Sequence, residues 1–271
     1  IADFIRDPDA RMNSLVGYAG VGKTTLLENI ARYALGQGMR VQAVAPVNKA
    51  VNRITEFFEK SNLKDVKTST LHKLLYKMSD DVIPRKRPRD ITPGTLIIVD
   101  ESSQLSVDYF KDLTNALKNS PGSKVLFVGD NFQTEAIGQD AHVLDAERSP
   151  VPPTHRASLT GLLRQEAGSG LGLTVTRMRA THTPAVPTRS TEDFQLHDGL
   201  RSFEDAYKKA LLENADDVAM IVATNADRLY WNKVARDTLF GAQASKALVA
   251  GDLLMSVANS VNVNNGEQLK V

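Results

Sequence analysis

The stretch Gly17-Tyr18-Ala19-Gly20-Val21-Gly22-Lys23-Thr24 fits the pattern G-x-x-x-x-G-K-[ST] at every fixed position. It follows the short apolar run Leu15-Val16 and leads into helix-forming residues from Thr25 to Ala31, which is the strand, loop, helix setting of a phosphate-binding loop. Glycines let consecutive backbone N–H groups point into one concavity, and the start of the helix adds positive potential. The stretch therefore predicts a site for a nucleoside triphosphate.

We expect this loop and the helical turn after it to hold ATP and Mg²⁺, the two expected cofactors. Lys23 reaches the outer phosphates, so it is also a predicted catalytic residue, and Thr24 supplies a hydroxyl to Mg²⁺. The predicted nucleotide-binding residues are Gly17, Gly20, Val21, Gly22, Lys23, Thr24 and Thr25.

The composition of the 271-residue chain is that of an ordinary globular protein. Its formal net charge of +1 gives no global signature of nucleic-acid binding, so any such binding must use local patches. The absence of cysteine excludes disulfides and thiolate metal sites. There is no secretory signal and no apolar run of about 18 residues, so we expect a cytoplasmic protein, of a bacterium or a phage-infected cell, with no membrane partner.

Apolar runs alternate with amphipathic patterns along the chain, which is typical of an α/β fold with a parallel sheet buried on both faces. Strands are predicted at Ser14–Gly17, Val41–Ala45, Leu96–Val99, Lys124–Val128 and Val218–Ala223. Helices are predicted at Thr24–Gln37, Asn48–Lys60, Thr70–Lys77, Val107–Asn119 and Ser202–Asn214. Prolines and a polar run between Pro184 and Ser190 predict a boundary between two domains there.

Two further strand ends carry the polar groups that a nucleotide site needs. Asp100 and Glu101 follow the apolar run Leu96–Val99 and read as a Walker B element. Asp100 is a predicted Mg²⁺ ligand, acting through water, and Glu101 is predicted to polarise the attacking water. Gln133 follows a third apolar strand, and its amide can both donate to a phosphate oxygen and accept from the water, so we predict that it senses the γ-phosphate.

In this order the elements resemble the superfamily 1 DNA helicases of the RecD and Dda group. The resemblance also includes Ala45 to Ala50, Thr70 to Leu75, Leu159 to Gln165, Ala223 to Asn225, Gly251 to Met255 and Asn265 to Glu267. It implies a P-loop NTPase with a RecA-like parallel sheet flanked by helices in residues 1–183. It further implies that residues 184–271 form part of a second RecA-like domain, which runs into a β-rich insertion.

The resemblance implies a helicase or translocase that couples ATP hydrolysis between two RecA-like domains to 5′ to 3′ stepping on single-stranded DNA and to strand separation at duplex junctions. Arg164 is then the catalytic arginine that contacts the γ-phosphate, as a planar guanidinium can bridge two oxygens. The implied DNA-binding residues are Pro46, Asn48, Lys49, Thr70, His72 and Asn225. A short, strongly basic insertion near residues 79–94, with Arg85 to Arg89, stands where the family has a small duplex-splitting β-hairpin, and its arginines either touch DNA or form a solvated loop. Replication or recombination proteins are the implied partners.

The chain departs from the family pattern after Gln133, where Thr134-Glu135-Ala136-Ile137 replaces an apolar, proline-containing tract. It begins at Ile1 inside a helical pattern and stops at Val271 before the later helicase motifs, so we expect a fragment that binds nucleotide and turns it over slowly by itself. Two other classes stay open. One is a P-loop ATPase or kinase unrelated to DNA, and the other is a non-catalytic nucleic-acid-binding module.

Overall fold

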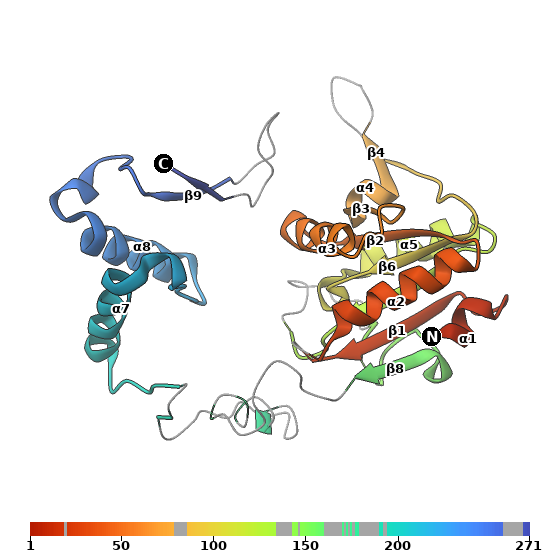
Figure 1. Ribbon diagram of the computed structural model, residues 1–271, viewed down its shortest axis with the longest axis horizontal. Helices are drawn as coiled ribbons and strands as arrows, with labels where there is room; N and C mark the ends of the chain where they lie inside the picture. Colours follow the sequence, from red (N-terminus) through yellow and green to blue (C-terminus); the bar gives the residue numbers. More distant parts are fainter. Residues whose placement is uncertain are drawn as a thin grey trace. The chain divides into compact units, whose positions relative to one another are not determined.

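The computed structural model describes residues 1–18, 21–78, 86–133, 143–145, 147–159, 170, 172, 174, 177–178, 190–191, 194–256 and 268–271. The chain forms two compact units, Ile1–Ala167 and Gly168–Val271 (Figure 1). The predicted boundary at Pro184 lies outside the described residues. Within the described ranges, no helix combines the length and the apolar character that crossing a membrane demands.

The first unit contains a six-stranded parallel sheet, as the apolar runs predict. Its strands lie in the order β3-β2-β6-β7-β1-β8. They are β1 (Met12–Gly17), β2 (Arg40–Ala45), β3 (Lys67–Thr70), β6 (Thr95–Val99), β7 (Lys124–Gly129) and β8 (Arg156–Leu159). Since all six run in the same direction, their carboxyl ends share one edge, which is where ligands of open α/β sheets bind.

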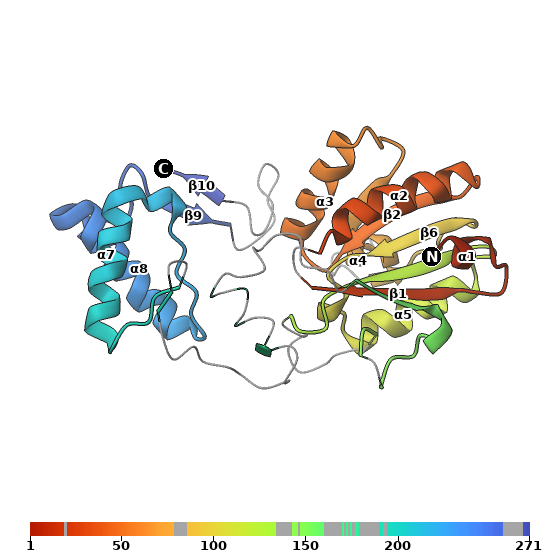
Figure 2. The ribbon, with the colours of Figure 1, turned by 60° about the horizontal axis from the view of Figure 1, so that its bottom comes forward.

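Successive residues of a strand point to opposite faces of a sheet, so the continuous apolar runs supply two separate cores. On β6, Leu96 and Ile98 pack with α1 (Ala2–Arg6), α2 (Lys23–Gly36) and α3 (Asn48–Lys60). Ile97 and Val99 pack on the other face with α4 (Leu71–Leu75) and α5 (Val107–Lys118). Figure 2 shows α2 and α3 on one side of the sheet and α5 on the other.

The structure corrects three details of the first unit. Strands β3 and β8 form the two sheet edges and were not among the predicted strands, because short runs such as Lys67–Thr70 carry little apolar pattern. The predicted helix Thr70–Lys77 ends at Leu75, where Tyr76 turns to an extended backbone. From there β4 (Tyr76–Met78) pairs antiparallel with β5 (Lys86–Pro88), and these two strands are the hairpin of the first unit.

Short 3₁₀ turns connect the elements: η1 (Ser102–Gln104) and η2 (Pro153–His155) in the first unit, and η3 (Ala215–Asp217) and η4 (Gly241–Ser245) in the second. The second unit is built on α7 (Leu200–Asn214) and α8 (Asn225–Phe240). Their contact centres on the ring of Trp231, which meets Phe203, Tyr207 and Tyr230 edge-on. An antiparallel pair, β9 (Leu253–Met255) and β10 (Gln268–Lys270), follows.

The prediction of a strand at Val218–Ala223 is wrong. The segment joins η3 to α8 in an irregular backbone, and Ile221 is 93% exposed. Its apolar sequence predicts burial in a sheet, but a strand forms only where a neighbouring backbone accepts and donates its hydrogen bonds. No described strand lies beside this segment in the sheets of the molecule.

Candidate functional site: a nucleotide site at the carboxyl edge of the sheet

The phosphate-binding loop begins where β1 ends. A Cβ added to Gly17 would lie 2.8 Å from Cγ2 of Val21 and 3.1 Å from Cβ of Leu159, so only glycine fits there. Gly22 has a φ of 85° and caps α2, which begins at Lys23. The ammonium of Lys23 donates hydrogen bonds to the carbonyl oxygens of Gly17 at 2.6 Å and Tyr18 at 2.8 Å.

The remaining predicted nucleotide-binding residues take different positions. Val21 is buried under the loop, Thr24 is partly exposed and Thr25 is exposed, both in the first turn of α2. Gly20 lies outside the described residues. The loop thus has the turn and the helix start of a phosphate cradle, since N–H groups at a helix N-terminus have no partner within the helix.

The two acids of the Walker B element follow β6 directly. The N–H of Asp100 donates to the carbonyl oxygen of Val44 at 2.8 Å, which continues the ladder between β6 and β2 by one bond. Glu101 has a φ of 52°, the left-handed region that costs a side-chain-bearing residue about 1–2 kcal/mol. The chain therefore turns sharply after Asp100, and strain of this kind concentrates at functional sites.

Burial raises the pKa of both carboxyl groups. For Asp100 this effect is opposed by a hydrogen bond from the Glu101 backbone and by the charges of Lys23 and Arg53. For Glu101 the charge of Asp100 adds to the effect of burial, while Lys23 and Arg53 again oppose it. Two carboxylates and two cations therefore act on one another at this edge.

The residues after β7 complete the edge. Asp130 is fully buried, and its carboxylate accepts a hydrogen bond from the N–H of Phe132 at 3.0 Å. The N–H of Gln133 donates to the carbonyl oxygen of Asp130 at 3.1 Å, and the rings of Phe132 and Tyr18 meet edge-on with centroids 6.4 Å apart. This contact places the loop that carries Gln133 beside the phosphate-binding loop.

The donors at this edge suit magnesium. The hydroxyl of Thr24 and the carboxylate of Asp100 are hard oxygen ligands, and Mg²⁺ bound with a nucleotide uses only one or two protein oxygens besides water and phosphate. No cluster of three or more His, Asp or Glu side chains that would form a separate metal centre occurs among the residues described.

The implied DNA-binding residues of the first unit lie at the same edge, where β2 and β3 end. Pro46 and Asn48 are partly exposed and Lys49 is exposed at the start of α3. The hydroxyl of Thr70 accepts a hydrogen bond from the N–H of Lys73 at 3.2 Å, so it caps α4. His72 is partly exposed on α4.

Asn225 and Arg164 are the remaining predicted site residues. Asn225 is exposed at the first position of α8 in the second unit. Arg164 lies outside the described residues, as do Arg85, the tract from Thr134 to Ile137 and the segment Asn265 to Glu267.

Sequence reasoning missed Arg53 as a residue of this site. Its charge lowers the pKa of both Asp100 and Glu101, so Arg53, on α3, lies close enough to act on both acids. The signal was present, because Arg53 stands one helical turn after Lys49 and residues four apart share a helix face. Tyr18 was missed too, since only the fold brings its ring against Phe132.

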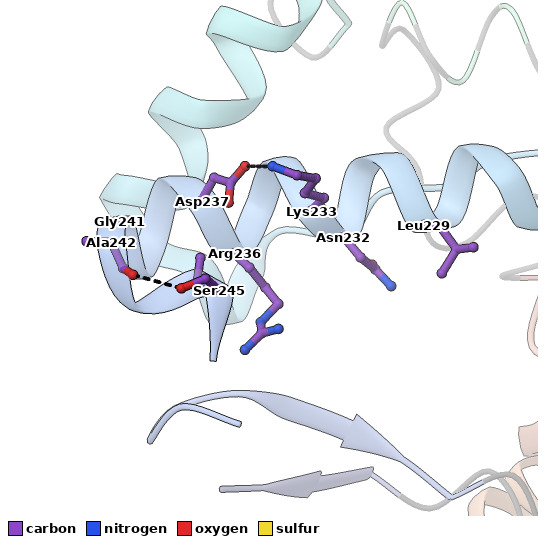
Figure 3. Close-up of a pocket in the computed structure, with 9 residues that line it drawn as sticks. Leu229, Asn232, Lys233, Arg236, Asp237, Gly241, Ala242 and Ser245 are labelled. Atoms are coloured by element: carbon purple, nitrogen blue, oxygen red, sulfur yellow. Dashed lines mark hydrogen bonds and ion pairs between the residues drawn. The ribbon is translucent and has the colours of Figure 1, made fainter. Parts of the chain in front are cut away.

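The second unit contains a cavity of about 470 Å³ beside α8 and η4 (Figure 3). Its charged side chains form ion pairs with one another or with Asp252. Lys233 pairs with Asp237, and the guanidinium of Arg236 donates two hydrogen bonds of 2.9 Å to the carboxylate of Asp252. That carboxylate also accepts from the N–H of Val249 at 2.8 Å, so these charges hold the unit together.

The AAA domain family matches residues 3–201. The ATP-dependent RecD2 DNA helicase of Deinococcus radiodurans is 31% identical over 157 residues, which are 58% of this chain and 20% of that protein. The RecBCD enzyme subunit RecD of Haemophilus influenzae is 26% identical over 155 residues, 51% of this chain and 23% of that protein. The resemblance to the RecD group is thereby confirmed, and this chain spans about a fifth of the length of these relatives.

Among solved structures, a crystal structure of Pif1 helicase from Candida albicans aligns with a TM-score of 0.42 and 14% sequence identity. That alignment covers 95% of this chain and 64% of the Pif1 chain.

Proposed function

We propose that this chain, which belongs to the AAA domain family, is the ATP-hydrolysing part of a DNA helicase or translocase that moves 5′ to 3′ along single-stranded DNA. The proposal rests first on the nucleotide site, where a phosphate-binding loop follows β1 and two acids follow β6 at the same edge of one parallel sheet. The relative from Deinococcus radiodurans is named an ATP-dependent DNA helicase, which supports the same function.

In the proposed mechanism each residue at the edge has one task. Lys23 exchanges the carbonyl oxygens of Gly17 and Tyr18 for the outer phosphates of ATP. Thr24 and Asp100 hold Mg²⁺, which neutralises charge on the phosphates. Glu101 accepts a proton from the attacking water, and Gln133 orients that water.

Arg164 completes the proposed site from the motif that follows β8. A guanidinium that contacts the γ-phosphate is worth about 10³- to 10⁵-fold in rate. We expect Arg164→Ala to bind ATP with affinity close to that of the parent and to hydrolyse it slowly. Hydrolysis by the variant at the parent rate would remove Arg164 from the site.

The observation that carries the link to DNA is the hydrogen bond from the N–H of Asp100 to the carbonyl oxygen of Val44. It joins the catalytic strand β6 to β2, the strand that leads into Pro46, Asn48 and Lys49. Amides, hydroxyls, imidazoles and ammonium groups donate to phosphate oxygens without reading base sequence. We therefore place single-stranded DNA along the starts of α3 and α4, against Lys49 and His72.

Strand separation tests the direction of movement. Duplexes with a 5′ or a 3′ single-stranded tail are incubated with the full chain and ATP, and strand release is followed by fluorescence. The proposal expects release, or displacement of a bound protein block, from the substrate with the 5′ tail. Equal activity on both tails, or preference for the 3′ tail, contradicts the assigned polarity.

We also propose that the protein acts in the cytoplasm on duplex junctions formed during replication or recombination, beside proteins of those pathways. The resemblance to RecD supports this placement. Cross-linking in cells followed by sequencing of the bound DNA tests it. Recovery of DNA without enrichment of forks or broken ends would contradict it.

A further inference from the structure

A hydrogen bond joins the start of the hairpin in the first unit to helix α5. The phenol of Tyr76 donates a hydrogen bond to the carboxylate of Asp112 on α5. Tyr76 is the residue at which α4 ends and β4 begins, and its backbone is extended with φ −130° and ψ 146°. The contact therefore lies at the point that sets the direction of the hairpin relative to α4.

The elements on the hairpin side of this contact are tied to one another. The ring of His72 lies 5.0 Å from the ring of Tyr76, measured between centroids. At the other end of the hairpin, the N–H of Arg89 donates to the carbonyl oxygen of Leu75 at 2.8 Å, and its guanidinium donates to that of Lys73 at 3.2 Å. His72, the hairpin and the residues on either side of Tyr76 are thus linked by direct contacts.

The other side of the contact leads to the catalytic acids. The N–H of Gln104 donates to the carbonyl oxygen of Glu101 at 3.0 Å, and the N–H of Leu105 donates to the carbonyl oxygen of Ser102 at 3.1 Å. These two hydrogen bonds connect η1 directly to Glu101. The hydroxyl of Ser106 then caps α5 by accepting from the N–H of Tyr109 at 3.4 Å. Asp112 stands one turn later on this same helix.

We propose that Tyr76 and Asp112 are positioning residues that couple DNA bound at α4 to ATP hydrolysis at Glu101. This inference rests on the proposed function, because it assumes that His72 contacts DNA. In this proposal, DNA that shifts α4 also shifts Tyr76. Because the phenol of Tyr76 is hydrogen-bonded to Asp112, the shift moves α5 and, through η1, Glu101. Burial and the Asp112 carboxylate raise the pKa of Tyr76, so the phenol keeps its proton and stays a donor at neutral pH.

Variants of the full chain test this coupling through the ratio of ATP hydrolysis with oligo-dT to hydrolysis without it. Tyr76→Phe keeps the ring against His72 and removes the hydroxyl, and Asp112→Ala removes the acceptor at an exposed position that tolerates substitution. We expect either change to lower the ratio at least about fivefold, the low end of coupling between sites. Hydrolysis without DNA and the apparent affinity for ATP should stay unchanged.

Three comparisons separate coupling from a general loss of structure. Asp112→Asn keeps an amide oxygen that accepts from the phenol, so it should retain most of the stimulation. The double variant of Tyr76→Phe and Asp112→Ala should lose no more than either single variant, since both remove one contact. Tyr230→Phe removes a similar bond of 2.9 Å to Glu204 in the second unit and should leave the ratio at the parent value.

The outcomes distinguish this inference from the function on which it rests. A parent protein that DNA does not stimulate overturns both. A stimulated parent whose Tyr76→Phe and Asp112→Ala variants keep the full ratio overturns only the coupling. If Tyr76→Phe fails to fold, Asp112→Ala and its Asp112→Asn partner decide the question by themselves.

Discussion

The hydroxyl of Ser102 accepts a hydrogen bond from the N–H of Val128 at 3.0 Å and donates one to the carbonyl oxygen of Val99 at 2.6 Å. Ser102 is buried and directly follows Glu101. One side chain thus holds the turn that carries Asp100 and Glu101 against the neighbouring strand β7. The position of Glu101 depends on this bond, because a left-handed backbone at a residue with a side chain persists only where surrounding contacts hold it.

Replacing Ser102 by alanine leaves the N–H of Val128 buried without its acceptor. We expect Ser102→Ala to lower the free energy of unfolding by about 1–3 kcal/mol, the cost of an unsatisfied buried donor. Urea unfolding measures the change. Thr114→Ala is the matched control, because it removes an exposed hydroxyl that bonds within α5. An equal effect of the two changes would contradict the role given to Ser102.

Gly129 lets η1 approach the end of β7. A Cβ there would lie 2.7 Å from Cδ1 of Leu144 and 3.1 Å from the backbone nitrogen of Ser102. We expect Gly129→Ala to destabilise the protein by about 1–3 kcal/mol through overpacking and to slow ATP hydrolysis by moving the acid turn. Gly36→Ala is the control, since nothing lies within 4 Å of its added Cβ and the unfolding free energy should hold or rise. Equal free energies of unfolding for the two variants would contradict the prediction, because they would show that β7 and η1 move apart at no cost.

Glu101, the proposed general base, is also expected to lower the free energy of unfolding when it is ionised. Because its pKa is raised in the folded chain, its ionised form opposes folding, and this opposition disappears below the unfolded value of about 4.3. We expect Glu101→Gln to raise the free energy of unfolding near pH 7.5, and the gain to shrink as pH falls through the raised pKa. Urea unfolding without nucleotide at several pH values measures it.

Glu28 provides a control of opposite sign. Hydrogen bonds from Arg32 and Ser61 lower the pKa of this carboxyl group, so its ionised form favours folding at neutral pH and that support is lost as pH falls. Glu28→Gln should therefore destabilise the protein near pH 7.5 and lose its effect in acid. The same trend with pH for both variants would contradict the assignment for Glu101.

The Glu101→Gln variant also tests the chemistry. We expect it to bind ATP and to hydrolyse it about 10²- to 10⁴-fold more slowly, the usual contribution of a general base. Filter binding and phosphate release separate the two steps. An unchanged hydrolysis rate would exclude Glu101 as the base and favour a non-catalytic module.

Lys23 is expected to contribute to the binding of ATP as well as to its hydrolysis. Lys23→Ala removes the ammonium that the loop holds through Gly17 and Tyr18, and with it the charge that meets the outer phosphates. We expect affinity for ATP to fall more than affinity for adenosine, which has no phosphates to lose. Titration with fluorescent ATP and adenosine analogues measures both, and equal losses would show that the substitution damages the fold.

The strand that precedes the phosphate-binding loop, the helix that follows it and the strand before the two acids were predictable because their signals are local. Six glycine, lysine and threonine positions and two strand-terminal acids follow one another closely enough for a pattern to fix their setting. The parallel sheet followed from continuous apolar runs, which Leu96 to Val99 illustrate with alternate residues in two cores.

The rest depended on contacts between distant parts of the chain. Tyr76 and Asp112 meet only after α4 and α5 pack on the sheet, and no spacing in the sequence marks them as partners. Arg53 lies close to the acids because β2 lies beside β6. The segment Val218–Ala223 has the composition of a buried strand and failed as a prediction because composition does not supply a neighbouring strand.

Steady-state ATP hydrolysis by the full chain, with and without oligo-dT at low and moderate salt, tests the central claim most directly. We predict that DNA stimulates hydrolysis and that the stimulation fades as salt rises, because the release of counterions from the phosphates gains less entropy in concentrated salt. The ratio matters more than the absolute rate, which is expected to be slow. Hydrolysis indifferent to DNA at every salt concentration would contradict the account and point to a P-loop ATPase that has no link to DNA.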